Sequence, residues 1–343
     1  MASNPSPLLR GLLGAALVGV SLSAALPGRA EASETLLDGL DYPWDIEAEG
    51  QTLYVTEKAG TLGILEDGQF QRLPVRTSAP ILNHRGGGLL GLALRPDFPR
   101  SRRVVLYHHT GTPDARTNRV IEAELRDGAW HETRVLLDDI PGHPLYNGGR
   151  VAFGPDGMLY VTTGWTENRA RPQDMESLAG KILRLTPDGA VPRDNPFPGS
   201  PVYSLGHRNP QGLAWDDSGQ LYAAEHGQSG NDEVNRIEAG GNYGWPLIEG
   251  DETRDGMQPP LAHSGRSTWA PSGLAWQDGH LLLASLRAGA VLAITPQGAV
   301  STAQDVGDRI RDVLVTPHGI FAITTNRSPR RDGPSDDRLI RLD

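Results

Sequence analysis

The chain of 343 residues has no cysteine, which excludes disulfide bonds and a lipid anchor on a cysteine. We therefore expect the core alone to hold the fold together. Beyond the N-terminal segment, no apolar run is long enough to cross a bilayer. Positive charge is also scarce, because 32 Lys and Arg against 42 Asp and Glu give a formal net charge of −10. Such a chain repels nucleic acid and anionic lipid, so we expect neither as a partner.

The N-terminal segment has the features of a cleaved secretory signal. Arg10 precedes an apolar run over residues 11–26, and Ala30-Glu31-Ala32 offers a cleavage site with small residues. We expect residues 1–32 to be a signal peptide and residues 33–343 to be a single mature domain. A retained N-terminal anchor is the alternative. Cleavage predicts a periplasmic or secreted protein that does not insert into a membrane.

Helical periodicity is nearly absent after this segment. The 42 glycines and 27 prolines are instead typical of a chain that turns often. Six segments share one pattern, in which a small apolar opening is followed by a Gly, Asp or Pro turn and an alternating strand. These segments are residues 45–57, 91–109, 151–164, 212–225, 273–286 and 313–325. Each is predicted to be a β-hairpin.

The hairpins recur at about 40 to 60 residues, which is the blade spacing of a β-propeller. Six copies predict an all-β, six-bladed β-propeller. Residues 33–40 and the C-terminal stretch 338–342 are expected to share the closing blade. The long polar loops 166–178 and 249–268 are expected on one rim, where functional residues often lie. The charged run 329–337 is predicted to be a solvated hairpin loop and is given no role.

Four arginines and an asparagine stand in or beside these hairpins. Arg208 and Asn209 directly precede an opening strand, and Arg287 follows a predicted strand. Arg309 and Arg311 are two residues apart, so their side chains point to one side of a strand. Two like charges on one side repel each other unless they are solvated or share an anion. A guanidinium group suits a carboxylate partner, although each arginine taken alone is equally compatible with a structural role.

A glycine-rich stretch after the fourth hairpin gathers acidic residues. Glu225, Asp232 and Glu233 lie close together in the sequence, and Tyr243 follows in a second glycine-rich turn. Hard oxygen ligands on tight backbone turns suit Ca²⁺. The alternative is a set of solvated acidic side chains without a ligand.

Three stretches in the middle of the chain resemble a known family. They are GKILRLTPDGAVPRDNPF at 180–197, LGHRNPQGLAW at 205–215 and GGNYGWP at 240–246. This combination is similar to the glucose/sorbosone dehydrogenase family, and shorter matches extend the resemblance over nearly all of residues 33–343. Members of that family are soluble aldose dehydrogenases that use pyrroloquinoline quinone (PQQ). Their fold is a six-bladed β-propeller, which agrees with the number of repeats.

The resemblance implies a common ligand for the arginines. PQQ is a planar ortho-quinone with three carboxylates, which guanidinium groups neutralise well. By position, Arg208 and Asn209 match the family's cofactor-binding pair, and Arg309 and Arg311 match its Arg-x-Arg motif. Arg287 stands where family members often have lysine, so the positive charge is kept. These five residues are expected to bind PQQ.

The resemblance also implies calcium. In the family, backbone carbonyls of a Glu-x-Gly-Pro turn bind the Ca²⁺ that polarises the quinone. The turn here is Glu225-His226-Gly227-Gln228, in which glutamine replaces proline. A backbone ligand tolerates that change, so Gly227 and Gln228 are expected to be metal ligands. Glu225 and Tyr243 match positions associated with a second, structural Ca²⁺.

The chain departs from the family where the general base belongs. In the family, a His in a His-x-Gly-Gly-Arg loop takes the proton from the sugar's anomeric hydroxyl, and an Asp after Thr-Gly orients it. Tyr146 stands at the His position here and Trp165 at the Asp position. A tyrosine with an ordinary pKa of about 10 is a poor base at neutral pH, and an indole only donates. A cofactor-contacting glutamine of the family is replaced by Gly86.

Three readings follow from these departures. In the first, Tyr146 or a displaced base such as His143 serves an enzyme that oxidises aldoses to lactones by hydride transfer to PQQ. The electron acceptor that follows is not identified. In the second, the propeller binds PQQ and Ca²⁺ but oxidises sugars poorly or not at all. In the third, Tyr146 and Trp165 fill the space of the family's catalytic site, and the propeller binds a different ligand. A Ca²⁺-dependent lactonase is a further candidate, but it gives the arginines no clear purpose.

Overall fold

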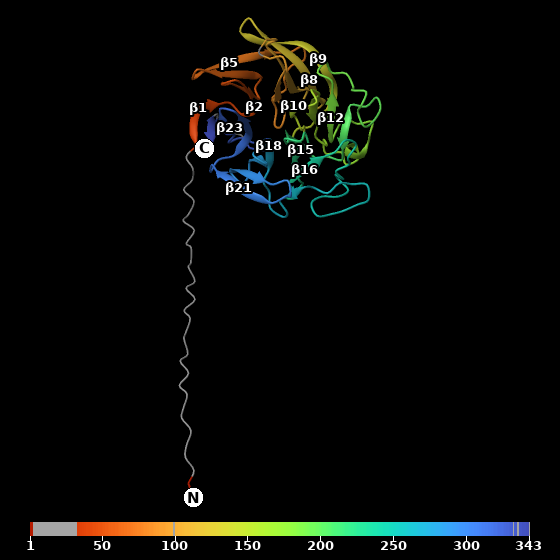
Figure 1. The fold of residues 1–343 in the computed structure, drawn as a ribbon. Helices are drawn as coiled ribbons and strands as arrows, with labels where there is room; N and C mark the ends of the chain where they lie inside the picture. The colour runs from red at the N-terminus through yellow and green to blue at the C-terminus, as the bar shows by residue number, and fades with distance from the viewer. Residues whose placement is uncertain (3–32, 99, 332, 335, 343) are drawn as a thin grey trace. The chain divides into compact units, whose positions relative to one another are not determined.

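The structure is a computed structural model that describes residues 1–2, 33–98, 100–331, 333–334 and 336–342. The predicted signal peptide lies almost wholly outside the described residues. The described strands form blades of four antiparallel strands each (Figure 1). A short 3₁₀ helix, η1 (Arg171–Gln173), lies in the loop after the third hairpin.

The first three blades follow one another in chain order. Blade 1 comprises β2 (Pro43–Glu49), β3 (Thr52–Glu57), β4 (Thr61–Glu66) and β5 (Gln69–Arg76). Blade 2 comprises β6 (Leu89–Leu94), β7 (Arg103–Gly111), β8 (Arg116–Arg126) and β9 (Ala129–Pro141). Blade 3 comprises β10 (Val151–Phe153), β11 (Leu159–Thr162), β12 (Lys181–Leu185) and β13 (Val202–Leu205).

The last three blades repeat this arrangement, except that the sixth takes its fourth strand from the N-terminal side. Blade 4 comprises β14 (Pro210–Trp215), β15 (Leu221–Glu225), β16 (Glu233–Ile237) and β17 (Ala262–His263). Blade 5 comprises β18 (Pro271–Gln277), β19 (His280–Ser285), β20 (Ala290–Ile294) and β21 (Val300–Asp305). Blade 6 comprises β22 (Ile310–Thr316), β23 (Gly319–Thr324), β24 (Asp337–Leu342) and β1 (Glu34–Leu40).

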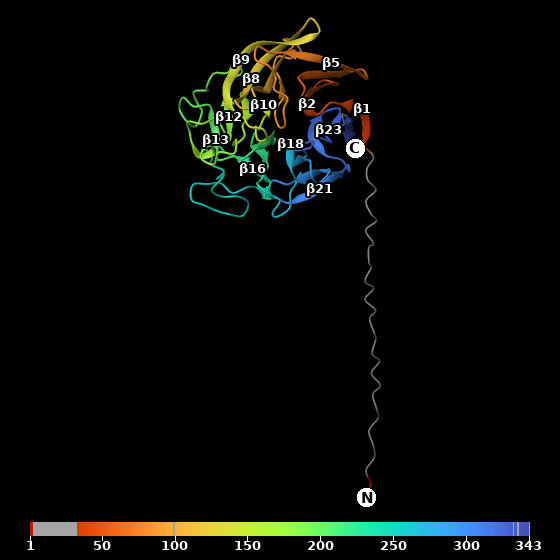
Figure 2. The same cartoon turned by 180° about the vertical axis from the view of Figure 1, so that it is seen from behind.

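The six predicted hairpins are the first two strands of the six blades. The opening strands contact one another from blade to blade, β2 with β6, β6 with β10, β14 with β18, β18 with β22, and β22 with β2. They therefore surround a common centre, as Figure 2 shows from the opposite side. The predicted all-β, six-bladed propeller is confirmed. Blades 1 and 2 are joined at their outer edges, because β5 and β9 pair in parallel.

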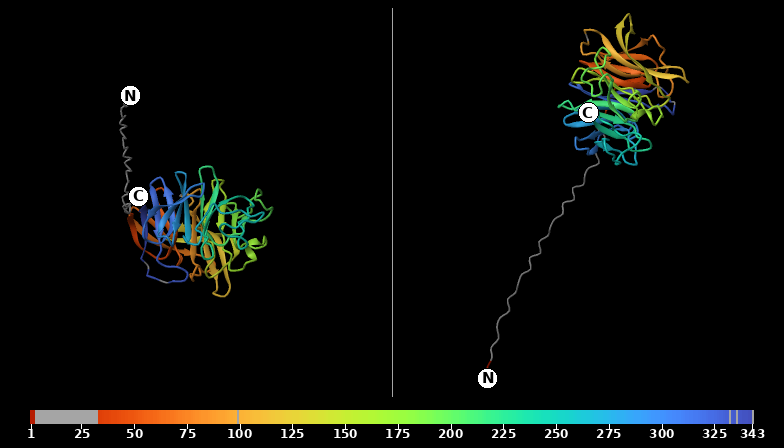
Figure 3. Two further views of the ribbon diagram at one scale, coloured as in Figure 1. Left: turned by 90° about the horizontal axis from the view of Figure 1, so that it is seen from below. Right: turned by 90° about the vertical axis from the view of Figure 1, so that its right-hand side faces the viewer.

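The two ends of the propeller meet in blade 6. β1 pairs with β24, with Glu34 opposite Arg341 and Thr35 opposite Ile340, so the N-terminal strand completes the C-terminal sheet. Figure 3 shows the blue C-terminal strands beside this red strand in its left-hand view. Buried apolar residues of blade 6, including Ile323, pack against blade 1, including Ile46. This closure protects the strand edges, as the sequence predicted for residues 33–40 and 338–342.

The tight turns follow from particular dipeptides. Asp67-Gly68, Asp127-Gly128 and Asp278-Gly279 each join two antiparallel strands with positive φ at both residues. A two-residue turn of this kind matches the right-handed twist of its strands, and glycine adopts positive φ without steric cost. These dipeptides therefore set the registers of their hairpins.

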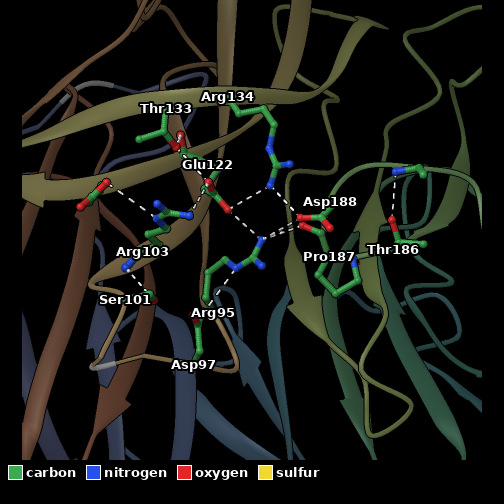
Figure 4. A network of polar contacts seen from close by, with 12 residues as sticks. Arg95, Asp97, Ser101, Arg103, Glu122, Thr133, Arg134, Thr186, Pro187 and Asp188 are labelled. Carbon is green, nitrogen blue, oxygen red and sulfur yellow. Dashed lines mark hydrogen bonds and ion pairs between the residues drawn. The ribbon is translucent and has the colours of Figure 1, made fainter.

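A buried carboxylate fastens blade 2 to blade 3 (Figure 4). Glu122 on β8 accepts from Arg95 at 2.7 Å and from Arg134 at 3.3 Å. Arg95 also donates to the carbonyl oxygen of Pro187 at 2.7 Å, and Arg134 donates to Asp188 at 2.8 Å. Pro187 and Asp188 lie in the turn after β12. The network leaves the charge of Glu122 compensated, as a buried carboxylate requires.

Candidate functional site

A cavity of about 380 Å³ gathers residues from blades 4, 5 and 6 and from the loop before β10. We call it the cationic cavity, because its lining includes Arg208, Arg287, Arg309, Arg311 and Arg330. Asn209, Tyr146, Gly227 and Gln228 line it as well. The structure thus brings together all five predicted cofactor-binding residues, which come from sequence positions about a hundred residues apart.

Within the described lining of the cationic cavity, the one carboxylate is that of Asp232, and it is already hydrogen-bonded to backbone amides. Its Oδ1 accepts from the Gly227 amide at 2.9 Å. Its Oδ2 accepts from the Thr268 hydroxyl at 2.6 Å and from the amides of Trp269 and Ala270 at 2.7 and 2.8 Å. Asp232 therefore fixes two loops of the cavity wall and forms no ion pair with the arginines.

Arg208 lies in a box of three aromatic rings. Its guanidinium carbon is 4.8 Å from the ring centre of Tyr146, 5.3 Å from that of Trp245 and 5.6 Å from that of Trp165. Nη1 donates to the carbonyl oxygen of His226 at 3.0 Å, whereas the buried Nε has no partner in the described structure. Burial lowers the pKa of Arg208. Cation–π contacts position this guanidinium without neutralising its charge.

Arg311 is the most deeply enclosed of the group. Burial lowers its pKa to about 10, and the nearby charge of Arg309 contributes to the shift. Nη1 donates to Gln211 at 3.1 Å and to Ser272 at 3.2 Å, while the buried Nε has no partner in the described structure. Arg309 donates to two backbone carbonyl oxygens at 3.1 Å each, and burial lowers its pKa as well.

These arginines are arranged for an anion with several charges. Among the described residues, no carboxylate forms an ion pair with Arg208, Arg309 or Arg311. A buried cation without a counter-charge destabilises the folded chain, and a bound anion removes that cost. The unpartnered Nε atoms of Arg208 and Arg311 are donors available to such an anion. The cavity therefore fits a compact ligand with several carboxylates.

Tyr146 is held at the edge of the cavity by the loop that precedes β10. The side chain of Asn147 clamps this loop, accepting from the His143 amide and donating to the His143 carbonyl oxygen, both at 2.8 Å. The hydroxyl of Tyr107 donates to the Asn147 carbonyl oxygen at 2.8 Å. Arg330, from the loop between β23 and β24, donates to the Tyr146 hydroxyl oxygen at 3.0 Å. The phenol is therefore held by its own loop, which Asn147 clamps, and by the hydrogen bond from Arg330.

His143 does not line the cationic cavity. Its ring stacks on that of Tyr146 with the centres 5.3 Å apart and the planes 7° from parallel. Nδ1 accepts from the Leu145 amide at 3.1 Å, and Nε2 faces the Glu167 carboxylate at 3.4 Å. Both ring nitrogens are thus engaged away from the cavity. Of the two predicted catalytic residues, Tyr146 lines the cavity and His143 packs behind it.

The departure at Gly86 belongs to the same rearrangement. Its amide donates to the Pro144 carbonyl oxygen at 2.7 Å. A Cβ atom at Gly86 would lie 2.8 Å from the Leu145 carbonyl oxygen and 2.9 Å from that of Pro144. Any larger residue, including glutamine, would displace the loop that carries Tyr146.

The predicted metal ligands divide between two places. Gly227 and Gln228 line the cationic cavity, whereas Glu225 and Tyr243 line a separate cavity of about 10 Å³, together with Gly227. Glu225 accepts from the Arg208 amide at 2.6 Å and from the His207 ring at 2.9 Å. The Tyr243 hydroxyl is engaged by backbone groups, so only its carbonyl is available to a metal. No cluster of three or more metal-ligating side chains occurs within the described residues.

Three residues of the site were not predicted from the sequence. Arg330 belongs to the charged run 329–337 that was given no role, yet it reaches Tyr146 across 184 residues of sequence. Gln211, which holds Arg311, follows directly after the recognised Arg-Asn-Pro stretch. Trp245, the third wall of the aromatic box, lies within the quoted stretch GGNYGWP. Proximity to recognised motifs was the only signal for the last two.

Acid is expected to loosen the Tyr146 loop through His109 on β7. The ring Nδ1 of His109 lies 2.6 Å from Asn118, which in turn donates to Asn147 at 3.3 Å. Burial lowers the pKa of His109 to about 4. The unfolded chain therefore binds the proton more tightly, and His109 by itself should lower the free energy of unfolding by about 3 kcal/mol as pH drops from about 6.5 to 4.

Chemical denaturation at pH 7, 5.5 and 4.5 measures this effect. His109→Gln should weaken the pH dependence, because the amide keeps a donor toward Asn118 without a titrating group. His318→Gln, at an exposed position, is the control and should leave the dependence unchanged. Equal pH dependence in His109→Gln and the parent chain would contradict the argument from burial.

The fold and the cavity together define a six-bladed propeller with buried arginines around one cavity, an arrangement that fits a multiply charged anion. The chain belongs to the glucose/sorbosone dehydrogenase family, whose model matches residues 40–334. It is 32% identical over 336 residues to the aldose sugar dehydrogenase YliI of Escherichia coli, covering 86% of this chain and 90% of that protein.

Solved structures give the same relationship. The PQQ-bound aldose sugar dehydrogenase of Streptomyces coelicolor is 36% identical and matches with a TM-score of 0.82, covering 89% of this chain and 95% of that one. A gluconolactonase of Xanthomonas campestris matches over 90% of this chain and 89% of its own, but with 17% identity and a TM-score of 0.51. That likeness shows the fold alone and does not support the lactonase alternative. The comparisons support an oxidoreductase of the sugar dehydrogenase kind.

Proposed function

We propose that the protein oxidises aldose sugars to lactones with PQQ and Ca²⁺. The observation that carries this proposal is the convergence of Arg208, Arg287, Arg309 and Arg311 on one cavity without an acidic partner among the described residues. The three carboxylates of PQQ would supply the missing negative charge. A relative with a bound PQQ supports the choice of this anion.

Calcium fits through backbone oxygens rather than through a cluster of acidic side chains. The Gly227–Gln228 turn lies on the cavity wall, where its carbonyl groups would act as ligands. At the second, smaller cavity, burial and the neighbouring Glu225 raise the pKa of Glu233 to about 8. Oε2 of Glu249 is buried there without a partner in the described structure. Both features support a cation in that cavity.

The remaining chemistry belongs to the chain's own residues. PQQ, when bound, would supply the acceptor for the hydride of the anomeric carbon. Arg208, Arg309 and Arg311 would hold its carboxylates, and Asn209, whose Oδ1 accepts from the Gly148 amide at 3.0 Å, is itself fixed. The phenolate form of Tyr146 would take the proton of the anomeric hydroxyl and become the neutral phenol. Arg330 donates to the Tyr146 oxygen and would stabilise that phenolate before the proton arrives.

The protein is proposed to act in the periplasm or outside the cell, in keeping with the predicted signal at residues 1–32. Among the residues that the structure describes, no helix combines the length and the apolarity that a bilayer crossing requires. The electron acceptor that reoxidises the cofactor is not identified by the site.

Binding of PQQ should raise the melting temperature of the protein. A ligand at about 100 times its Kd stabilises the native state by about 2.7 kcal/mol, which corresponds to about 4 °C for a chain of this size. Differential scanning fluorimetry with PQQ and Ca²⁺ measures the shift. Chelation of Ca²⁺ should reduce it.

The trimethyl ester of PQQ is the matched control, because it keeps the ring and lacks the three negative charges. It should give little or no shift. A shift as large as that of PQQ would mean that the arginines do not recognise the carboxylates. No shift at saturating PQQ would remove the cofactor from the proposal.

A further inference from the structure

A second compartment of about 590 Å³ adjoins the cationic cavity. The two share Leu145, Ser328, Pro329 and Arg330, so they are continuous on the side of the β23–β24 loop. We call the second one the outer compartment. Its remaining lining comes from the turn before β2, the turn after β3, the loop before β6 and the β23–β24 loop, and consists of Tyr42, Lys58, Asn83, His84, Arg85, Arg327 and Arg331.

The outer compartment is positively charged, and no acidic residue occurs among the described residues of its lining. Arg85, Arg330 and Arg331 are exposed there, and none of them forms an ion pair with a described carboxylate. Within the described part of the chain, the side chain of Arg330 donates to the hydroxyl oxygen of Tyr146. This concentration of positive charge occurs on a chain whose net charge is −10, so general composition does not explain it.

The cofactor does not account for these charges either. Four arginines already line the inner part of the cationic cavity, Arg208, Arg287, Arg309 and Arg311. These four positive charges already exceed the three negative charges that the carboxylates of PQQ bring. Arg85 and Arg331 line the outer compartment and not the cationic cavity, so the carboxylates of PQQ in the cationic cavity would not reach them. Their charges remain available to a second anionic group beside Tyr146.

We propose that the outer compartment binds the anionic group of an anionic aldose, either a sugar phosphate or a sugar acid. This inference rests on the proposed function, because it places the anomeric end of the sugar at Tyr146. Arg330 marks the boundary, since it lines both cavities and contacts the Tyr146 hydroxyl at 3.0 Å. Arginine forks bind phosphate and carboxylate groups in the same bidentate manner, so the site selects for charge at the far end of the sugar.

Steady-state dye reduction by the protein loaded with PQQ and Ca²⁺ tests the preference. At low ionic strength, glucose 6-phosphate or glucuronate should have a kcat/KM at least about tenfold above that of glucose, carried by a lower KM. A preference for the phosphate alone assigns a sugar phosphate, and a preference for glucuronate alone assigns a sugar acid. Added salt should shrink the difference. An equal or greater kcat/KM for glucose would overturn the proposal.

The double variant Arg85→Gln/Arg331→Gln should lose the preference and oxidise glucose at the parent rate, because neither residue lines the cationic cavity. Arg126→Gln, at an exposed position on β8, is the matched control and should retain the preference. A double variant that still prefers the anionic sugar would contradict the assignment of the outer compartment.

A binding measurement separates this inference from the proposed function. Sorbitol 6-phosphate has no anomeric hydroxyl, so it reports binding without turnover, with sorbitol as the neutral control. Calorimetry should detect binding of sorbitol 6-phosphate to the parent and a loss in Arg85→Gln/Arg331→Gln, even if no sugar is oxidised. Binding without oxidation of any sugar would refute the proposed dehydrogenase activity and would support the proposed anion site. Failure of sorbitol 6-phosphate to bind a protein that does oxidise glucose would refute the sugar-phosphate form of the anion site and leave the dehydrogenase standing.

Discussion

Arg311→Met is expected to abolish saturable PQQ binding and, at the same time, to stabilise the protein that has no cofactor. Arg311 is buried, and burial lowers its pKa to about 10 because no counter-charge lies beside it among the described residues. Replacing a buried charge by an apolar side chain of similar length removes its desolvation cost, at about 1–2 kcal/mol. The loss of charge-assisted bonds to a carboxylate should weaken PQQ binding by about 100-fold or more.

Two measurements are needed, because the two effects have opposite signs. The melting temperature without PQQ should rise in Arg311→Met, and titration with PQQ should produce little further shift. Arg236→Met is the matched control, since Arg236 is exposed on β16 and donates to Gln220 at 3.1 Å. Arg236→Met should leave both the melting temperature without PQQ and the shift produced by PQQ close to those of the parent. A variant that melts lower than the parent without PQQ would show that the bonds of Arg311 to Gln211 and Ser272 outweigh the cost of burial.

The fold could be predicted because it repeats. Six hairpins with similar openings and turns each bury one face, and a stack of such units has few ways to close. The pairing of β1 with β24 was also accessible, because a propeller needs a strand to complete its last blade. Details such as the parallel pairing of β5 with β9 were not, since they depend on how outer strands of neighbouring blades meet.

The candidate site was predictable only where the sequence carries a motif. Arg208, Asn209, Arg309 and Arg311 lie in motifs, and the structure places them around one cavity. The contact of Arg330 with Tyr146 has no local signal, because it arises when the first half and the end of the chain meet across the ring.

The roles of Trp165 and His143 were equally hidden from the sequence. Trp165 was read as the replacement of an orienting carboxylate, and in the structure it is one wall of the box around Arg208. His143 was a candidate base by residue type, but the direction of its ring decides its role. Motifs therefore identified the charges, whereas the geometry around Tyr146 depended on the folded loops.

Tyr146→Phe is expected to lower the turnover of aldoses by about 100-fold or more while leaving PQQ binding intact. General acid–base groups contribute about 10²–10⁴ to a rate. The phenylalanine ring keeps the contact with Arg208, whose guanidinium lies 4.8 Å from the ring centre of Tyr146, and removes only the hydroxyl that Arg330 holds. Dye reduction and the PQQ melting shift, measured on the same preparations, separate the two functions. Turnover equal to that of the parent would exclude Tyr146 as the proton acceptor.

Tyr146→His decides between a working enzyme and a propeller that binds PQQ without turnover. An imidazole accepts a proton at neutral pH more readily than a phenol does, so Tyr146→His should raise the turnover of aldoses at pH 7. His143 stacks on this ring and leaves its outer face to the cavity, so the replacement preserves the direction of the side chain. Measurable activity in the parent that increases in Tyr146→His supports catalysis at this position. Activity that appears only in Tyr146→His would mean that the parent retained the cofactor site after losing its base.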